Sequence, residues 1–170
     1  KLSLPFVDEG LIGGGFRVPD ILAASGAKLR EVGTTNITTL SDYERAIGPE
    51  TALILRVHRS NFYLSGHTEE PSLSELSALA RSRNLPLVMD LGSGSFRRWR
   101  GHDPVHEPTV QEVLRSGADL VTFSGDKLVG GPQAGFVVGA SAAVQRLAKH
   151  ALYRAMRVGR ITLVTMQEFL

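Results

Sequence analysis

The stretch TVQEVLRSGADLVTFSGDKLVGGPQAGFVVG, residues 109–139, decides the fold, because it contains the signals for a helix, two strands and the loop between them. Thr109 and Glu112 have the spacing of a capping box, in which two side chains bind backbone N–H groups in the first turn of a helix. Gly117 lies where a left-handed residue would end that helix. Two short and mostly apolar or β-branched runs, typical of buried strands, complete the stretch: residues 119–123 and 135–139.

The same alternation continues toward the N-terminus. Two more capping boxes predict two more helix starts: Ser41 with Glu44, and Ser72 with Glu75. Gly48 lies where it would end the first of these helices in a left-handed conformation, and Pro86 begins a new element after the second. Apolar runs predict the strands between the helices: residues 51–57 and 86–90.

One more helix and strand are predicted over residues 19–32, where Pro19 stands at the helix start and Gly26 at its end. Near-continuous apolar strands that alternate with capped helices favour a mostly parallel sheet covered by helices on both faces. The fold class is therefore α/β.

Composition sets limits on function. The chain has 170 residues, enough for a single domain with its own core, and 42% of them are hydrophobic and 21% charged, as in soluble globular proteins. It has no cysteine, which excludes disulfides, thiolate metal sites and thiol nucleophiles. No apolar run approaches the length of a membrane span, so we expect a cytoplasmic protein.

Polar side chains follow three of the predicted strands. In open α/β sheets ligands bind at the carboxyl ends of the strands, so these residues mark the expected site. They are His58, Ser60 and Asn61 at the end of the strand predicted at 51–57, Asp90, Gly92, Ser93 and Gly94 at the end of the strand at 86–90, and Ser124, Asp126 and Lys127 after the strand at 119–123.

Asp90 and Lys127 together favour chemistry that uses pyridoxal 5'-phosphate (PLP). A lysine amine forms a Schiff base with the cofactor aldehyde, and a carboxylate keeps the pyridine nitrogen protonated. Lys127 is therefore the candidate Schiff-base lysine and Asp90 the candidate partner of the ring nitrogen. His58 is a candidate to stack on the cofactor ring or to hydrogen-bond to it. A purely structural histidine, hydrogen-bonded within the protein at the end of a strand, is an equally good explanation.

Simpler explanations exist for each residue alone. An aspartate at a strand end often caps the following loop, and a lysine in a glycine-rich loop is usually solvated. The loop around Lys127 is not a Walker loop, and GLIGGGF at residues 10–16 lacks the glycine spacing of a dinucleotide fingerprint. His102 and His106 lie in a loop with proline and acidic residues, Glu107 among them, which favours solvated side chains over a metal site.

Several segments are similar to one known family, the bacterial selenocysteine synthases, which are L-seryl-tRNA(Sec) selenium transferases. The likeness extends from about Gly14 onward, and FSGDKLVGGPQAG is its most specific motif. The matching segments are EVGTTN (31–36), GHTEEPSLSEL (66–76), VMDLGSGS (88–95), EPTVQEVLRSGADLVTFSGDKLVGGPQAG (107–135) and RAMRVGRITL (154–163).

The resemblance implies an aspartate-aminotransferase-like PLP enzyme that converts seryl-tRNA(Sec) to selenocysteinyl-tRNA(Sec) with selenophosphate, through an aminoacrylyl intermediate. It implies that Lys127 is the Schiff-base lysine and Asp90 the ring-nitrogen partner, with Ser124 also at the cofactor. Arg154 and Arg157 match positions that hold the phosphate-like selenium donor, and their spacing predicts one shared helix face. Asp126 is a candidate for proton transfer during elimination. The family also suggests a homo-oligomer, a ring of dimers.

The chain also departs from the family pattern. Ile37 stands where the family usually has arginine, Gly159 and Arg160 replace its usual residues, and residues 1–13 do not match. The family's tRNA-recognition region and small domain have no counterpart here, so we expect the central part of the large PLP-binding domain. Two alternatives stay open: a related PLP-dependent lyase acting on a phosphorylated amino sugar or amino acid, and a catalytically silent binding or assembly fragment.

Overall fold

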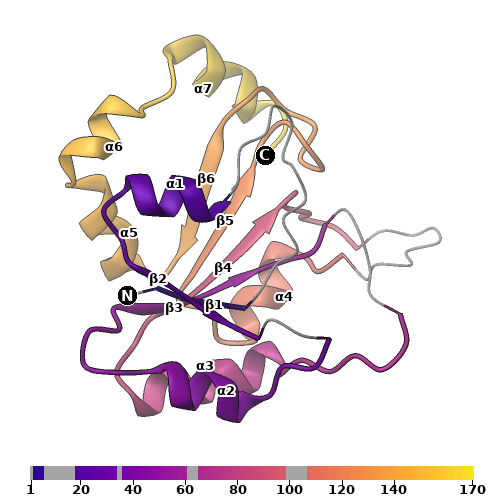
Figure 1. Ribbon diagram of the computed structural model, residues 1–170. Helices are drawn as coiled ribbons and strands as arrows, with labels where there is room; N and C mark the ends of the chain where they lie inside the picture. The colour runs from indigo at the N-terminus through magenta and orange to yellow at the C-terminus, as the bar shows by residue number, and fades with distance from the viewer. Residues whose placement is uncertain (1, 6–17, 34–35, 61–64, 99–106) are drawn as a thin grey trace.

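The computed structural model describes residues 2–5, 18–33, 36–60, 65–98 and 107–170 (Figure 1). The strands are β1 (Leu2–Pro5), β2 (Leu29–Val32), β3 (Leu53–Val57), β4 (Leu87–Gly92), β5 (Leu120–Ser124) and β6 (Gly135–Gly139). The helices are α1 (Val18–Ala24), α2 (Leu40–Ala46), α3 (Leu73–Ser82), α4 (Val110–Arg115), α5 (Ser141–Ala148), α6 (Ala151–Ala155) and α7 (Arg160–Gln167).

The strands form one sheet in the order β2-β1-β3-β4-β5-β6. All neighbours pair in parallel except β5 and β6, which are antiparallel. The predicted α/β architecture with a mostly parallel sheet is confirmed. β1 was not predicted, and β6 runs antiparallel because residues 125–134 contain no crossover helix to return the chain to the other end of the sheet.

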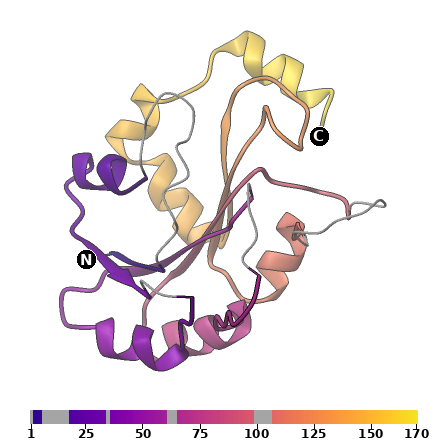
Figure 2. The ribbon, with the colours of Figure 1, turned by 45° about the vertical axis from the view of Figure 1, so that its right-hand side comes forward.

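One face of the sheet packs on α2, α3 and α4 (Figures 1 and 2). Alternate residues of β4 supply this core: Leu87, Met89 and Leu91 are buried against the helices. Side chains alternate along a strand, so Asp90 is directed to the opposite face. The helices α5, α6 and α7 follow β6 along the other side of the sheet, and α7 ends near the loop between β5 and β6.

Two of the three predicted capping boxes are confirmed. Ser72 Oγ accepts from the Glu75 N–H, and Thr109 Oγ1 accepts from the Glu112 N–H, both at 3.2 Å. Gly117 adopts the expected left-handed conformation, with φ of 97°.

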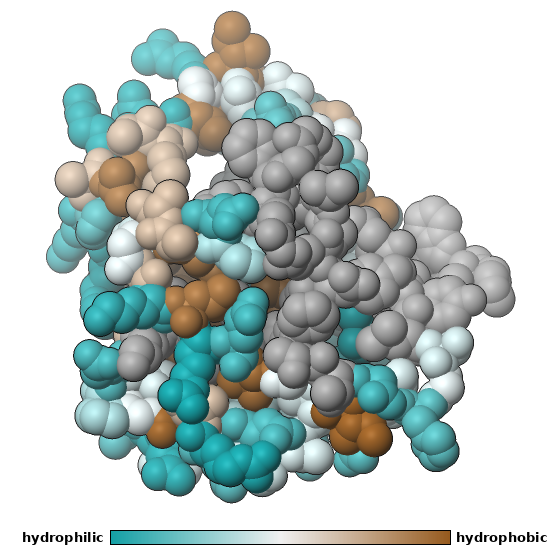
Figure 3. Space-filling view, in the orientation of Figure 1, coloured by the Kyte–Doolittle hydropathy of each residue, from teal (hydrophilic) through white to brown (hydrophobic). Residues whose placement is uncertain are grey.

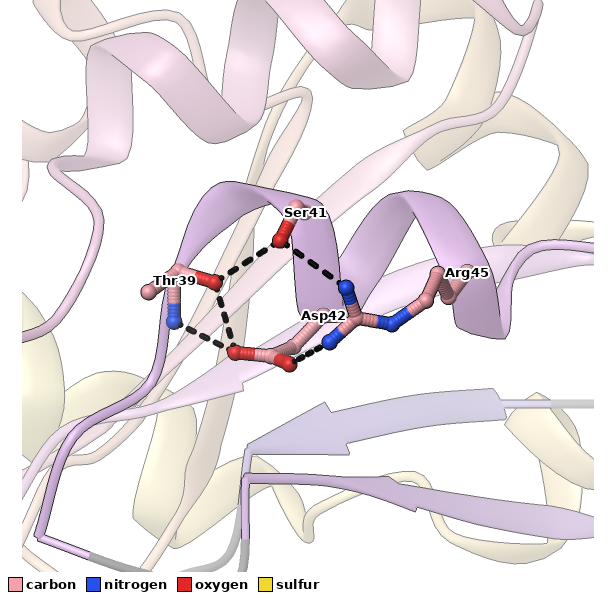
Figure 4. A network of polar contacts seen from close by, with 4 residues as sticks. All are labelled: Thr39, Ser41, Asp42 and Arg45. Atoms are coloured by element: carbon pink, nitrogen blue, oxygen red, sulfur yellow. Dashed lines mark hydrogen bonds and ion pairs between the residues drawn. The ribbon is translucent and has the colours of Figure 1, made fainter.

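The prediction for α2 was wrong by two residues (Figure 4). The helix begins after Thr39, and Asp42 supplies the carboxylate that accepts from the Thr39 N–H at 2.7 Å. Arg45 reaches back to Asp42 and Ser41 and fixes this arrangement. Gly48 does not end the helix in a left-handed conformation, because Ile47 leaves the helix with extended backbone before it. A Thr-x-x-Asp box binds the N–H groups of a first helical turn as a Ser-x-x-Glu box does, and residues 39–44 contain both patterns.

The capping box of α4 predicts a pH-dependent stability. The Thr109 N–H, the Arg98 guanidinium and the Thr109 hydroxyl all stabilise the charged Glu112 carboxylate and lower its pKa from 4.5 to about 2. A group whose folded-state pKa is depressed stabilises the fold above its unfolded pKa, and this contribution is lost as the pH falls toward the folded value. We therefore expect wild type to be more stable than Glu112→Gln at pH 6, with a difference that shrinks between pH 4.5 and 2. Urea unfolding across this range measures it, and a constant difference would contradict the assignment.

Candidate active site

The predicted site lies where β3, β4 and β5 end side by side. Val57 is in register with Asp90, and Asp90 is in register with Thr122. The His58 N–H continues the ladder and donates to the Asp90 carbonyl at 2.8 Å. β4 extends two residues past Asp90, where the predicted strand ended, and β5 extends one residue past its predicted end to include Ser124. Asn61, His102 and His106 lie outside the described residues.

The Asp90 carboxylate is half-buried on the sheet face away from α2 and α3. Its Oδ1 accepts from Thr122 Oγ1 at 2.9 Å and from the Gly92 N–H at 3.1 Å. Two donors on one oxygen hold the carboxylate in a fixed orientation. Its second oxygen is the atom suited to a cationic partner.

The Lys127 amine lies beside the end of β4. A Cβ built on Gly92 would lie 3.9 Å from Lys127 Nζ and 3.7 Å from Ser60 Oγ. Gly92 follows Asp90 by two residues, so residues from the ends of β3 and β4 and from the turn after β5 converge there. The predicted pairing of Asp90 and Lys127 at one edge of the sheet is consistent with this geometry.

The turn that carries Lys127 has a defined conformation. The Gly130 N–H donates to the Lys127 carbonyl at 2.9 Å, and the Gly131 N–H donates to the Gly125 carbonyl at 2.9 Å. Met166, buried in α7, packs against this turn: a Cβ on Gly125 would lie 2.5 Å from Met166 Cε, and one on Gly131 would lie 2.8 Å from its Sδ. The two glycines therefore allow α7 to contact the turn closely.

His58 belongs to a second polar cluster at the same edge. Its Nε2 lies 2.8 Å from Glu107 Oε2, and the side chains of His58 and Glu107 are 15% and 11% exposed. The other carboxylate oxygen of Glu107 accepts from Ser93 Oγ at 2.8 Å, and Ser93 is buried. One carboxylate thus connects the residue after β3 to the residue after β4.

The remaining predicted residues are more peripheral. Asp126 is exposed in the turn, and Ser124 is half-buried as the last residue of β5. Arg154 is exposed in the last turn of α6. The prediction that Arg157 shares one helix face with Arg154 was wrong, because α6 is capped at Met156 and Arg157 lies in the segment before α7. Ile37, Gly159 and Arg160 are exposed.

Two residues of the site, Glu107 and Thr122, were not predicted from the sequence. Glu107 was counted among the acidic residues of a solvated loop, although it stands only two residues before Thr109, the N-cap residue of α4. Thr122 was counted as a β-branched strand residue. The sequence signal that could have identified Thr122 is its hydroxyl, which lies on the strand next to Asp90 and on the same face of the sheet.

These side chains fit PLP. An amine, a carboxylate with one oxygen already held, and an imidazole are the groups that such a cofactor needs at its aldehyde, ring nitrogen and ring face. Gly92 leaves space where the Lys127 amine and the Ser60 hydroxyl converge. In the described part of the chain, no cluster of three or more histidine, aspartate or glutamate side chains is placed to hold a metal ion. The same residues include no helix long and apolar enough to cross a membrane.

Comparisons with known proteins point to one family. Residues 9–170 match the family model SelA, L-seryl-tRNA selenium transferase. The relative from Desulfomicrobium baculatum is 51% identical over 156 residues, and that from Mannheimia succiniciproducens is 52% identical over 156 residues. Both are named L-seryl-tRNA(Sec) selenium transferase, and in each case the match covers 92% of this chain and 34% of the relative. The chain therefore spans about a third of the length of these relatives.

Solved structures share the fold at lower identity. D-glucosaminate-6-phosphate ammonia-lyase superposes with a TM-score of 0.72 at 24% identity, covering 98% of this chain and 42% of that one. A double mutant of Thermus thermophilus aspartate aminotransferase gives a TM-score of 0.62 at 16% identity, covering 99% of this chain and 42% of that one. The expected aspartate-aminotransferase-like fold is confirmed.

Proposed function

Because the chain belongs to the L-seryl-tRNA selenium transferase family, we propose that it forms the PLP-binding core of an enzyme that converts L-seryl-tRNA(Sec) to selenocysteinyl-tRNA(Sec) with selenophosphate. The observation that carries the proposal is the convergence of the Lys127 amine with the strand end that bears Asp90. PLP, when bound, supplies an electron sink for breaking bonds at the seryl α and β carbons.

The residues of this chain have separate tasks. Lys127 would anchor the cofactor through its amine and would serve as the base for the substrate α proton. Asp90, oriented by Thr122 and the Gly92 N–H, holds a proton on the cofactor ring nitrogen. His58 would contact the cofactor ring, and Ser124 ends the strand that leads to the lysine turn.

Asp126 and two arginines are assigned to the substrates. Asp126 is exposed beside Lys127, where it can take up or return a proton as the seryl hydroxyl leaves. Arg154 and Arg157 present guanidinium groups, which match the oxygens of selenophosphate. Met166 packs the C-terminal part of α7 against the lysine turn, and Arg157 precedes the N-terminal end of the same helix.

We also propose a homo-oligomer. Apolar side chains stand exposed over α6 and α7, at the top of Figure 3, with Met156 74% and Ile161 84% exposed. An apolar surface of this kind is typical of interfaces with other chains or domains. It supports assembly into a homo-oligomer that acts on seryl-tRNA(Sec).

The test of the function uses a chimera. This chain replaces the matching 156 residues of the Desulfomicrobium baculatum relative, and conversion of seryl-tRNA(Sec) with selenophosphate is measured. We expect turnover, and we expect seryl-tRNA(Sec) to bind more tightly than bulk tRNA across a salt titration. Equal binding of both tRNAs together with no turnover would refute the proposal and favour a lyase or a silent assembly fragment.

A prediction follows for the carboxylate. Asp90→Asn removes the charge facing the ring nitrogen, and we expect PLP to bind roughly ten- to a hundredfold more weakly, which corresponds to about 1.5–3 kcal/mol for a charged hydrogen bond. Thr122→Val removes one donor and is expected to weaken binding only about two- to tenfold. The exposed Thr165→Val is the matched control. Absorbance titration with PLP measures all three, and a larger loss for Thr122→Val than for Asp90→Asn would contradict the assignment.

A further inference from the structure

The cluster of His58, Glu107 and Ser93 has no role in the function proposed so far beyond the contact of His58 with the cofactor. We infer that Glu107 is a positioning residue, which fixes the tautomer and the ring orientation of His58 at the cofactor. The inference rests on the proposed function in that it names PLP as the group against which His58 is held. It concerns the residues of this chain, which also allow a test without the cofactor.

The His58 side chain is held at both of its ends. The His58 backbone is held by its N–H bond to the Asp90 carbonyl, so the imidazole starts from a fixed point next to the carboxylate strand. The bond from Nε2 to Glu107 Oε2, at 2.8 Å, then fixes the far end of the ring. A side chain held at both its backbone and its tip has one orientation, which is what a flat group needs to pack on a cofactor ring.

A carboxylate only accepts hydrogen bonds, so the His58 Nε2 that faces Glu107 must carry a hydrogen. The same carboxylate accepts from Ser93 Oγ, which fixes the rotation of Glu107. Carboxylates that orient a functional histidine through one ring nitrogen are a recurring arrangement, and removing them typically costs ten- to a hundredfold in affinity for the bound group in metal sites.

Glu107 stands two residues before Thr109, the N-cap residue of α4, and the Val110 N–H at this helix start donates to the Ser95 carbonyl at 2.9 Å. The carboxylate is therefore carried by ordered backbone that is attached to the segment after β4. The helix start, the β4 end and the β3 end are joined through one side chain.

The test compares five variants of the 170-residue chain with PLP as the probe. We expect Glu107→Ala to raise the PLP dissociation constant about tenfold and to diminish the visible circular dichroism of bound PLP, which reports how the ring is held. Glu107→Gln retains an acceptor for His58 and should recover most of both signals. In a His58→Phe background, Glu107→Ala should change them less than about twofold, because the residue acts through His58. The exposed Glu44→Ala is the matched control.

A second measurement needs no cofactor. Nitrogen NMR of the histidine rings, with His58 assigned by its loss in His58→Phe, should show hydrogen on Nε2 in wild type and a changed tautomer pattern in Glu107→Ala. Equal losses of PLP affinity in the wild-type and His58→Phe backgrounds, or a wild-type His58 with hydrogen on Nδ1 alone, would overturn the inference. Failure of wild type to form a covalent link between Lys127 and PLP would instead overturn the proposed function, and the NMR result would still decide the role of Glu107.

Discussion

Lys127→Ala is expected to abolish the covalent attachment of PLP. Wild type, mixed with PLP and reduced with borohydride, should carry the label on the peptide that contains Lys127, and the variant should carry none there. Without the amine, the cofactor is held by noncovalent contacts alone, so its affinity should fall at least about a hundredfold. Turnover in the chimera should fall at least about a thousandfold, because the same amine serves as a base.

The fold should survive this change, because the Lys127 side chain is exposed and the turn is held by backbone bonds between other atoms. Circular dichroism and the unfolding midpoint of Lys127→Ala should therefore match wild type. Lys149→Ala, another exposed lysine, is the control and should keep the label. Labelling of Lys127→Ala at wild-type level, on any other lysine, would remove the central assignment.

Gly94→Ala should be the most destabilising of the substitutions considered. Gly94 has φ of 66°, and a Cβ there would lie 2.5 Å from Phe123 Cγ. The ring cannot yield, because Phe123 is buried, stacks on Phe136 at 5.0 Å and meets Phe96 edge-on at 5.5 Å. Left-handed strain and overpacking together cost roughly 2–5 kcal/mol. This is a large share of the roughly 5–15 kcal/mol that stabilises a typical domain.

Thermal unfolding measures this effect, and we expect the midpoint to fall by roughly 5–15 °C. Gly48→Ala is the control, since a Cβ there meets no atom within 4 Å and its φ is not positive; it should shift stability by less than about 0.5 kcal/mol. Repeating Gly94→Ala in a Phe123→Leu background should reduce the loss, because the smaller side chain makes room. An unchanged midpoint for Gly94→Ala would mean that the segment after β4 moves freely.

Several parts of the fold were predictable because their signals are local. Residues 72–75 and 109–112 form the predicted helix starts, and the apolar runs around Ile54, Met89 and Val121 form the predicted central strands. The errors also have local causes. At α2, the Thr39–Asp42 box overlaps the predicted Ser41–Glu44 box, and the helix uses the first of them. At Arg157, the prediction assumed helical spacing beyond the point where α6 ends. Side-chain spacing alone does not show where a short helix stops.

By itself, the sequence determined the α/β class, the capped helices, the family and the candidate pair of Asp90 and Lys127, because each depends on neighbouring residues or on one continuous motif. Only the tertiary structure decided how the site is held. Thr122 orients Asp90 across 32 positions, Glu107 holds His58 across 49, and Met166 packs against the lysine turn. Such contacts depend on strand register and on where a helix docks, and these are fixed when the whole sheet assembles and not by any short stretch of chain.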